Sequence, residues 1–266
     1  MSRVATIRLL GSGTSAGVPI IGCSCPVCTS SDPLDNRLRP GVWMECDGFA
    51  LEIDVSPDFR QQALRYRLPR VDAVLVTHCH ADHVLGLDEL RRYNTLQKSD
   101  IALYARDFTM NGIERIFDYI VHPKPLAEKL GMYRPHISFH RVADESFDVG
   151  PFRIRTLEIP HGPVSSTAVE VSLDGRRFVF ASDCSEVTPA LRDMLRGADL
   201  AMLDALRDRP HAAHLSFAES IETLRSCGVA RGRLVHIGHD VLHEELLRRC
   251  EGTAVRPGFD GECYEL

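Results

Sequence analysis

The segment Thr77 to His83 places three histidines and one aspartate within six residues, directly after the apolar run Val71 to Val76. A strand end delivers such side chains into one crevice, and imidazole with carboxylate is the mixed donor set of hydrolytic metal sites. Packing explains the cluster poorly, because each buried imidazole needs its own hydrogen-bond partner. The segment therefore predicts a metal centre at a strand end, with the donors His78, His80, Asp82 and His83.

Length and charge limit the classes of function. A chain of 266 residues that is 44% hydrophobic can bury a large core, and we expect one domain over residues 1–266. The net charge of −6 disfavours long nucleic acid and anionic membranes as partners, because binding to either is stabilised by clustered Lys and Arg side chains. A small anionic substrate remains compatible, because bound metal ions would supply local positive charge.

The sequence gives several indications of compartment. No apolar run approaches the roughly 18 residues of a membrane span, and Met1 to Leu10 does not resemble a signal peptide. The nine cysteines are an odd number, and Cys23, Cys25 and Cys28 lie too close together for an ordinary disulfide framework. Reduced thiols with a metal role fit better, and we expect a cytoplasmic protein.

Apolar periodicity and turn residues predict an α/β fold of mixed sheets with helices outside. Asp47-Gly48 and Asp174-Gly175 each separate two β-type runs, as in tight hairpins. The segment His122 to His136 is rich in proline and is the candidate lid or substrate-facing excursion. The expected strands are 4–10, 42–46, 49–53, 71–76, 101–104, 152–159, 166–173, 177–181, 200–204 and 234–237, and the expected helices are 57–67, 88–96, 107–120, 188–196, 216–227 and 243–250.

The run from His78 to His83 resembles the HxHxDH signature of the metallo-β-lactamase superfamily. The resemblance extends through later positions: His161 after Ile159-Pro160, Asp183 after Phe180-Ala181-Ser182, and His236 after Leu234-Val235. It implies an αββα sandwich of two mixed β-sheets flanked by helices. It also implies two catalytic divalent ions, manganese or zinc. His78, His80 and His161 would hold the first, Asp82, His83 and His236 would hold the second, and Asp183 would bridge them.

A narrower resemblance concerns Cys23, Cys25 and Cys28, whose C-x-C-x-x-C spacing is similar to the structural zinc loop of PhnP-type phosphodiesterases. Three thiolates need a fourth ligand in a closed zinc site, and the resemblance implies His239 for that position. The glycine-rich opening, 11–19, also looks like this branch. Buried or merely reduced thiols are the alternative reading of the three cysteines.

The resemblance also implies roles in catalysis. His214 matches a histidine that is not a metal ligand in related phosphodiesterases, and we expect it to be the general acid that protonates the leaving oxygen, with nearby His211 as its competitor. Asp82 is assigned to the catalytic set as well as to the metal site. Arg91 is either a phosphate contact or a salt-bridged helix residue. Asp54 either orients a ligand or serves as a turn residue.

These expectations combine into a metal-dependent phosphodiesterase that hydrolyses a small cyclic or nucleotide-like phosphodiester. A metal-bridging hydroxide would be the nucleophile, so Cys79 inside the signature is not needed as one. The alternatives are a thioester or lactone hydrolase of the same fold, a tRNA-processing nuclease, and a noncatalytic PqqB-like binding protein. No membrane partner is expected, and a homodimer is left open.

Overall fold

The two Asp-Gly dipeptides form the tight hairpins that the sequence predicts. Asp47 and Gly48 adopt φ values of 51° and 76° between β2 (Gly41–Cys46) and β3 (Phe49–Ile53), which pair antiparallel. Asp174 and Gly175 join β9 (Val164–Leu173) to β10 (Arg176–Ala181) in the same way. The computed structural model describes residues 3–266, apart from the side chains of residues 127 and 128.

These hairpins lie in two separate sheets, each of seven strands within the described chain. The first sheet has the order β14-β1-β2-β3-β4-β5-β6 and the second has the order β13-β12-β11-β10-β9-β8-β7. Both sheets mix parallel and antiparallel pairs. The remaining strands are β1 (Thr6–Gly11), β4 (Ala73–Val76), β5 (Ile101–Arg106), β6 (Ile137–Val142), β7 (Phe147–Val149), β8 (Phe152–His161), β11 (Leu200–Asp204), β12 (Gly232–Val235), β13 (Val255–Pro257) and β14 (Cys263–Glu265).

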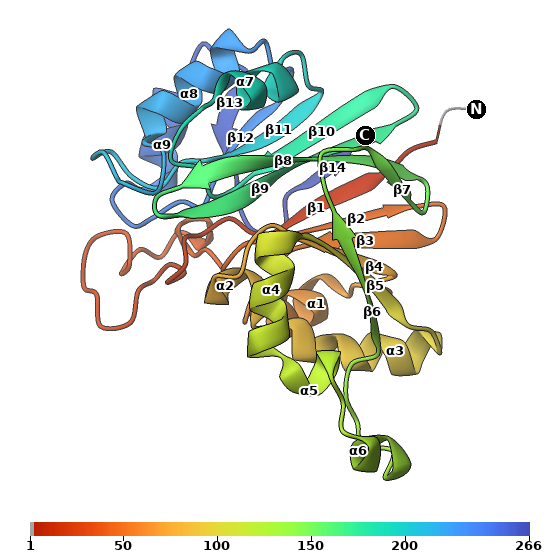
Figure 1. The fold of residues 1–266 in the computed structure, drawn as a ribbon. Coiled ribbons are helices and arrows are strands. Elements are labelled where there is room, and N and C mark those ends of the chain that lie inside the picture. The colour runs from red at the N-terminus through yellow and green to blue at the C-terminus, as the bar shows by residue number, and fades with distance from the viewer. Residues whose placement is uncertain (1–2) are drawn as a thin grey trace.

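Helices cover the outer face of each sheet, as Figure 1 shows. Ser216 caps α8 with the capping box that Glu219 completes, and Thr188 caps α7 ahead of a proline in its first turn. The second sheet is covered by α7 (Pro189–Leu195), α8 (Phe217–Ser226) and α9 (His243–Arg249). The other helices are η1 (Pro33–Asp35), α1 (Phe59–Tyr66), α2 (Ala81–Val84), η2 (Leu87–Leu90), α3 (Arg91–Gln97), α4 (Asp107–Ile116), α5 (Asp118–Val121) and α6 (Pro125–Lys129).

The hydrophobic core has three layers that match this arrangement. The central layer joins the facing sides of the two sheets, with Leu9 and Ile53 from the first and Phe178 and Met202 from the second. One outer layer lies under α7 to α9 and the other lies under α1, α3 and α4. Burial of both faces of each sheet confirms the αββα sandwich. None of the helices in the described chain combines the length and apolar character needed to cross a bilayer.

Three predicted elements differ from the observed ones, and backbone geometry accounts for the first two. The strand expected at 234–237 ends at Val235, because His236 turns into the left-handed region with φ of 58°. The helix expected at 107–120 divides into α4 and α5 at Phe117, whose φ and ψ of −116° and 42° are not helical. The helix expected at 88–96 begins as the 3₁₀ turn η2 and continues as α3.

Candidate metal centre and active site

The fold brings the predicted ligands together from the ends of strands in both sheets. His78 follows β4, while Asp82 and His83 lie on the single turn α2. In the second sheet, His161 ends β8, Asp183 follows β10 and His236 follows β12. Strands β10, β11 and β12 are parallel neighbours, so their carboxyl ends meet at one edge of the sheet.

The first histidine group, His78, His80 and His161, points three ring nitrogens at one another. His80 Nδ1 lies 2.9 Å from His78 Nε2 and 3.2 Å from His161 Nε2. Two nitrogens on one tetrahedral zinc ion are separated by about 3.3 Å, given Zn–N bonds of about 2.0–2.1 Å. The three nitrogens are therefore spaced as ligands of one ion.

The second group, Asp82, His83 and His236, lies next to the first. Asp82 Oδ2 is 3.1 Å from His83 Nε2 and 3.5 Å from His236 Nε2. All three atoms are buried without a hydrogen-bond partner, and such atoms are costly unless a ligand or ion satisfies them. The donors and their unsatisfied atoms fit a second divalent ion.

Asp183 lies between the two groups. Its Oδ1 is 3.7 Å from His161 Nε2 and 3.4 Å from His236 Nε2, and its Oδ2 is 3.2 Å from His83 Nε2. The carboxylate thus reaches donors of both groups, as the bridging role requires. Asp183 is 1% exposed, so water does not compete strongly for these positions.

The electrostatics of this cluster favour a cation. Burial opposes a charge on His83, yet the surrounding carboxylates, Asp183 first, raise its pKa well above the usual value. The same opposition of burial and carboxylates raises the pKa of His236 to about 9. Carboxylates that favour protonation of two buried histidines make the pocket negative. Bound divalent ions would neutralise that negative charge directly.

Neighbouring groups fix the orientation of the ligand rings. Asp54 is fully buried, and its carboxylate accepts hydrogen bonds from the Thr77 amide at 2.8 Å and from His83 Nδ1 at 2.7 Å. His161 Nδ1 donates to the Ala213 carbonyl at 2.8 Å. These contacts leave Nε2 of both histidines facing the site. Of the two readings of Asp54, orientation of a ligand is the one that this contact supports.

His214 lies beside the cluster and is held by a residue that sequence reasoning missed. His214 Nδ1 donates to Asp204 Oδ2 at 2.9 Å, and its ring stacks on His236 with centroids 4.6 Å apart. Asp204 is fully buried at the end of β11 and also accepts from the Cys184 amide. The sequence signal that could have found Asp204 is its position at the end of the predicted strand 200–204. That strand lies between the predicted strands associated with Asp183 and His236.

The tautomer of His214 follows from this contact. With Nδ1 protonated against Asp204, Nε2 is the nitrogen free to meet a substrate. Burial, followed by the charge of His236, lowers the pKa of His214 to about 4. The competitor His211 is exposed, and its Nδ1 accepts from the Ala213 amide instead of meeting a carboxylate.

The cysteine loop forms a further donor cluster, separate from the two groups described above. The Sγ atoms of Cys23, Cys25 and Cys28 each lie 3.4 Å from His239 Nδ1. Tetrahedral zinc with Zn–S of about 2.3 Å and Zn–N of about 2.0 Å separates sulfur from nitrogen by about 3.5 Å. The backbone amide of Cys28, which donates to Cys25 Sγ at 3.4 Å, lowers the pKa of Cys25 to about 6. The four residues fit a closed zinc site.

The glycine-rich opening supports the segment that carries His236. Ile237 donates to the Ser12 carbonyl at 3.0 Å and accepts from the Thr14 amide at 3.1 Å. At Gly11 and Gly13, a Cβ atom would collide with the backbone of residues 37–39. These glycines therefore permit close chain approach, which explains them without a phosphate-binding role.

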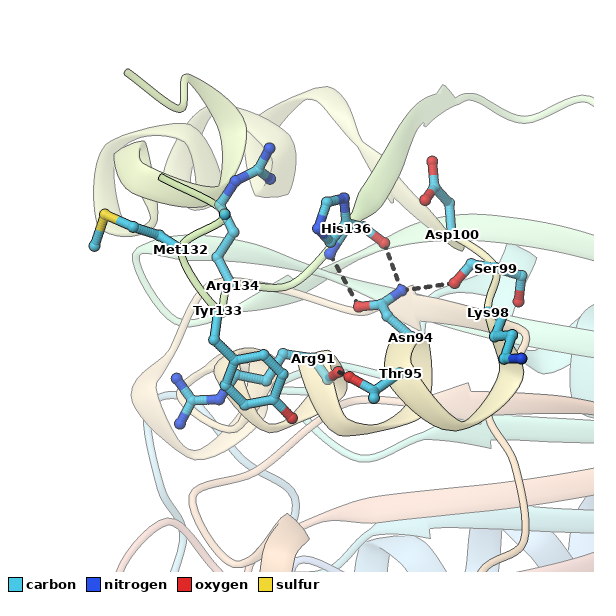
Figure 2. A pocket seen from close by; sticks show the side chains of 11 residues that line it. Arg91, Asn94, Thr95, Lys98, Ser99, Asp100, Met132, Tyr133, Arg134 and His136 are labelled. Carbon is cyan, nitrogen blue, oxygen red and sulfur yellow. Dashed lines mark hydrogen bonds between the residues drawn. The ribbon is translucent and has the colours of Figure 1, made fainter. Parts of the chain in front are cut away.

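The excursion 122–136 lies against α3 and lines a cavity of about 590 Å³ with it. Figure 2 shows how Asn94 ties the two segments together: it donates to the His136 carbonyl at 2.8 Å and accepts from the His136 amide at 2.9 Å. Arg91 lies in this cavity, 2.8 Å from Asp88 and over the Tyr133 ring. Of the two readings of Arg91, the structure supports the salt-bridged residue. The cavity lining includes none of the metal-cluster residues.

Cys79, within the signature, has a packing role. Its Sγ donates to the Thr109 carbonyl at 2.8 Å, and burial raises its pKa to about 11. It is therefore a thiol near neutral pH, not a thiolate nucleophile. At Gly112, a Cβ atom would collide with this sulfur, so α4 packs directly on the signature loop.

Comparison with known proteins adds three relatives. A diphosphatase from the PhnP family, known from its crystal structure, is 34% identical, and the match covers 100% of this chain and 98% of that chain with a TM-score of 0.89. Zn(2+)-bound PqqB from Methylobacterium extorquens shares the fold, with 20% identity, coverage of 98% and 100%, and a TM-score of 0.80. An octanoyltransferase of Porphyromonas gingivalis is 33% identical over 95% of this chain. This chain spans half of that protein's length.

The family assignment rests on a match to a family model, on the likeness to the PhnP-family diphosphatase and on the signature itself. Residues 51–237, which contain every candidate ligand of the two histidine and aspartate groups, match the beta-lactamase superfamily domain. The likeness to the PhnP-family diphosphatase extends over the whole chain, including the cysteine loop that precedes this domain. The chain therefore belongs to the beta-lactamase superfamily and, within it, to the PhnP family.

Proposed function

We propose that the protein is a metal-dependent hydrolase that cleaves a small cyclic or nucleotide-like phosphodiester. The observation that carries the proposal is the pair His214 and Asp204 beside two groups of candidate metal ligands. Hydrolysis of a thioester or lactone, the alternative reaction, needs an activated water and an oxyanion site. Cleavage of a phosphodiester with an alkoxide leaving group gains most from a proton donor. The position of His214 beside the candidate ligands, with its Nδ1 held by the buried carboxylate of Asp204, supports this role.

The ligand groups would hold two divalent ions, manganese or zinc, bridged by Asp183. Such ions, when bound, supply an activated water and neutralise charge on phosphoryl oxygens. The chain supplies the rest: Asp54 and the Ala213 carbonyl hold ligand rings in place, and Asp82 contributes its carboxylate to the second group. The cysteine loop with His239 would hold a structural zinc ion.

His214 would carry the proton for the leaving oxygen. In the chain alone, burial keeps its pKa low, so the ring must gain a proton when substrate binds. A phosphodiester anion on one side of the ring and Asp204 on the other both stabilise the imidazolium. Donation from Nε2 to the leaving oxygen then returns the ring to its neutral form, with Nδ1 still bonded to Asp204.

Diphosphate cleavage is the second candidate, and the 34% identity to a diphosphatase favours it. Attack at phosphorus is common to both reactions, but the leaving group differs. A phosphate leaving group is weakly basic and needs little protonation, whereas an alkoxide needs much. The importance of His214 therefore differs between the two candidates.

The experiment replaces His214 with alanine and varies the leaving group of a diester. We expect kcat to fall about a thousandfold for an alkoxide leaving group and about tenfold for p-nitrophenolate, because general acids contribute most when the departing oxygen is basic. Metal content should be unchanged in the variant.

His211→Ala is the matched control, since this exposed neighbour lacks the carboxylate partner, and it should behave as wild type. Equal losses for both leaving groups would refute the general-acid role. Turnover of diphosphates but of no diester by the wild type would favour the second candidate.

A further inference from the structure

A cavity of about 340 Å³ opens directly beside the first histidine group. One wall is the signature loop, a second is the start of β9, and the third is α4. Its volume suits a ring-sized group of a ligand, since small-molecule sites begin at roughly 300 Å³. The lining consists of His78, Cys79, His80, Phe108, Gly112, Arg115, Val164 and Ser165.

The wall formed by α4 is held firmly in place. Cys79 Sγ bonds to the Thr109 carbonyl, and the absence of a side chain at Gly112 allows α4 to contact this sulfur. Phe108 lies next to Thr109, half-buried, and lines the cavity with the apolar Val164. A preformed cavity with an aromatic side chain suits a flat ring, because stacking needs little rearrangement.

Arg115 gives this cavity an available positive charge. Within the described residues it makes no ion pair, and its Nε donates to the Asn111 carbonyl at 3.1 Å. The acidic residues of α4 already form ion pairs with another arginine, because Arg141 of β6 lies 3.0 Å from Asp107 and 2.6 Å from Glu114.

On the opposite wall, the acid that contacts the lining residue Ser165 is Glu158, and it already has partners of its own. Ser165 donates to Glu158 at 2.6 Å, and Arg106 lies 3.8 Å from the same carboxylate. The guanidinium of Arg115 is thus the charge that the cavity offers to a ligand. A guanidinium binds phosphate strongly in such a position, through paired N–H donors.

We propose that this cavity holds the non-leaving arm of the substrate, and that this arm is nucleotide-like, with a flat ring against Phe108 and a second phosphate at Arg115. The inference rests on the proposed function and narrows it. A cyclic sugar phosphate without a base has no flat aromatic ring that could stack on Phe108. A substrate with a base and a further phosphate uses both residues.

The test uses three diesters with the same leaving group, the p-nitrophenyl esters of methyl phosphate, thymidine 5′-phosphate and thymidine 3′,5′-bisphosphate. For wild type, kcat/KM should rise along this series. Phe108→Ala should lower the ratio of the thymidyl to the methyl ester about tenfold, as expected for one lost base–aromatic stack. Arg115→Ala should lower the ratio of the bisphosphate to the thymidyl ester about tenfold, and Arg115→Lys should restore part of it.

Arg60→Ala is the matched control, because this exposed arginine of α1 is not part of the cavity lining, and it should keep the wild-type ratios. If wild type shows no preference along the series, or if both cavity variants keep the wild-type ratios, the inference is overturned while the diesterase stands. Loss of all three activities in equal proportion would also overturn it, because that result indicates a structural role. Absence of any diester hydrolysis by wild type would instead overturn the proposed function.

Discussion

Replacing His236 with alanine is expected to lower kcat for diester hydrolysis by at least about a thousandfold. His236 contributes one of the three donors of the second group, and its Nε2 also lies 3.4 Å from Asp183. Loss of that ion would remove several kcal/mol of transition-state stabilisation, and each 1.4 kcal/mol is tenfold in rate. Steady-state kinetics with excess metal measures the loss.

The same variant tests whether two neighbouring histidines serve separate metal sites. His239 follows His236 by three residues yet faces the cysteine loop. Elemental analysis after dialysis against a mild chelator should therefore still find one zinc per chain in His236→Ala. Loss of this zinc would show that the two sites are not independent.

Replacing Cys25 with serine is expected to remove the tightly held zinc and to destabilise the protein by about 3 kcal/mol or more, because formation of a structural zinc site contributes to folding free energy. Thermal unfolding should shift down by about 6–12 °C, at the 2–4 °C per kcal/mol typical of large domains. The site joins the loop after β1 to the segment after β12, so both segments should loosen.

Cys263→Ser is the control for this result, because Cys263 is the exposed cysteine of β14 and lies outside the cluster. It should retain zinc and melt as wild type does. Retention of one chelator-resistant zinc by Cys25→Ser would refute the assignment of the structural site.

The central strands and the positions of the candidate ligands were predictable because their signals are local. Apolar runs such as Leu200 to Asp204 are buried on both faces, so they stand out in the sequence. Most candidate ligands lie at or shortly after the ends of such runs, and the signature identifies the first four of them. The Asp-Gly hairpins were predictable for a similar reason, since both turn residues need positive φ.

The strands that the sequence did not reveal are the edges of the two sheets: β14 and β6 in the first, β13 and β7 in the second. Three of them have only three residues each. The fourth, β6, buries none of its residues fully. Edge strands pair on one side and bury less apolar surface, so hydrophobic periodicity is weak there.

Asp204 was missed because its role depends on a contact between distant segments. A carboxylate at a strand end is a turn residue in most chains, and only the fold brings His214 within 2.9 Å of it. The cavity beside His80 has the same origin, because Phe108 and Arg115 on α4 meet Val164 of β9 only in three dimensions. Sequence periodicity places residues on elements but does not place the elements against each other.

The most direct test of the central claim is a comparison of kcat/KM for bis(p-nitrophenyl) phosphate, the matching monoester, a thioester and a lactone, with wild-type protein stripped by chelator and then reloaded with manganese or zinc. We expect the stripped protein to be inactive and the reloaded protein to prefer the diester over the other three substrates. Faster turnover of the thioester or lactone than of any diester, or diester hydrolysis that persists without added metal, would contradict a metal-dependent phosphodiesterase.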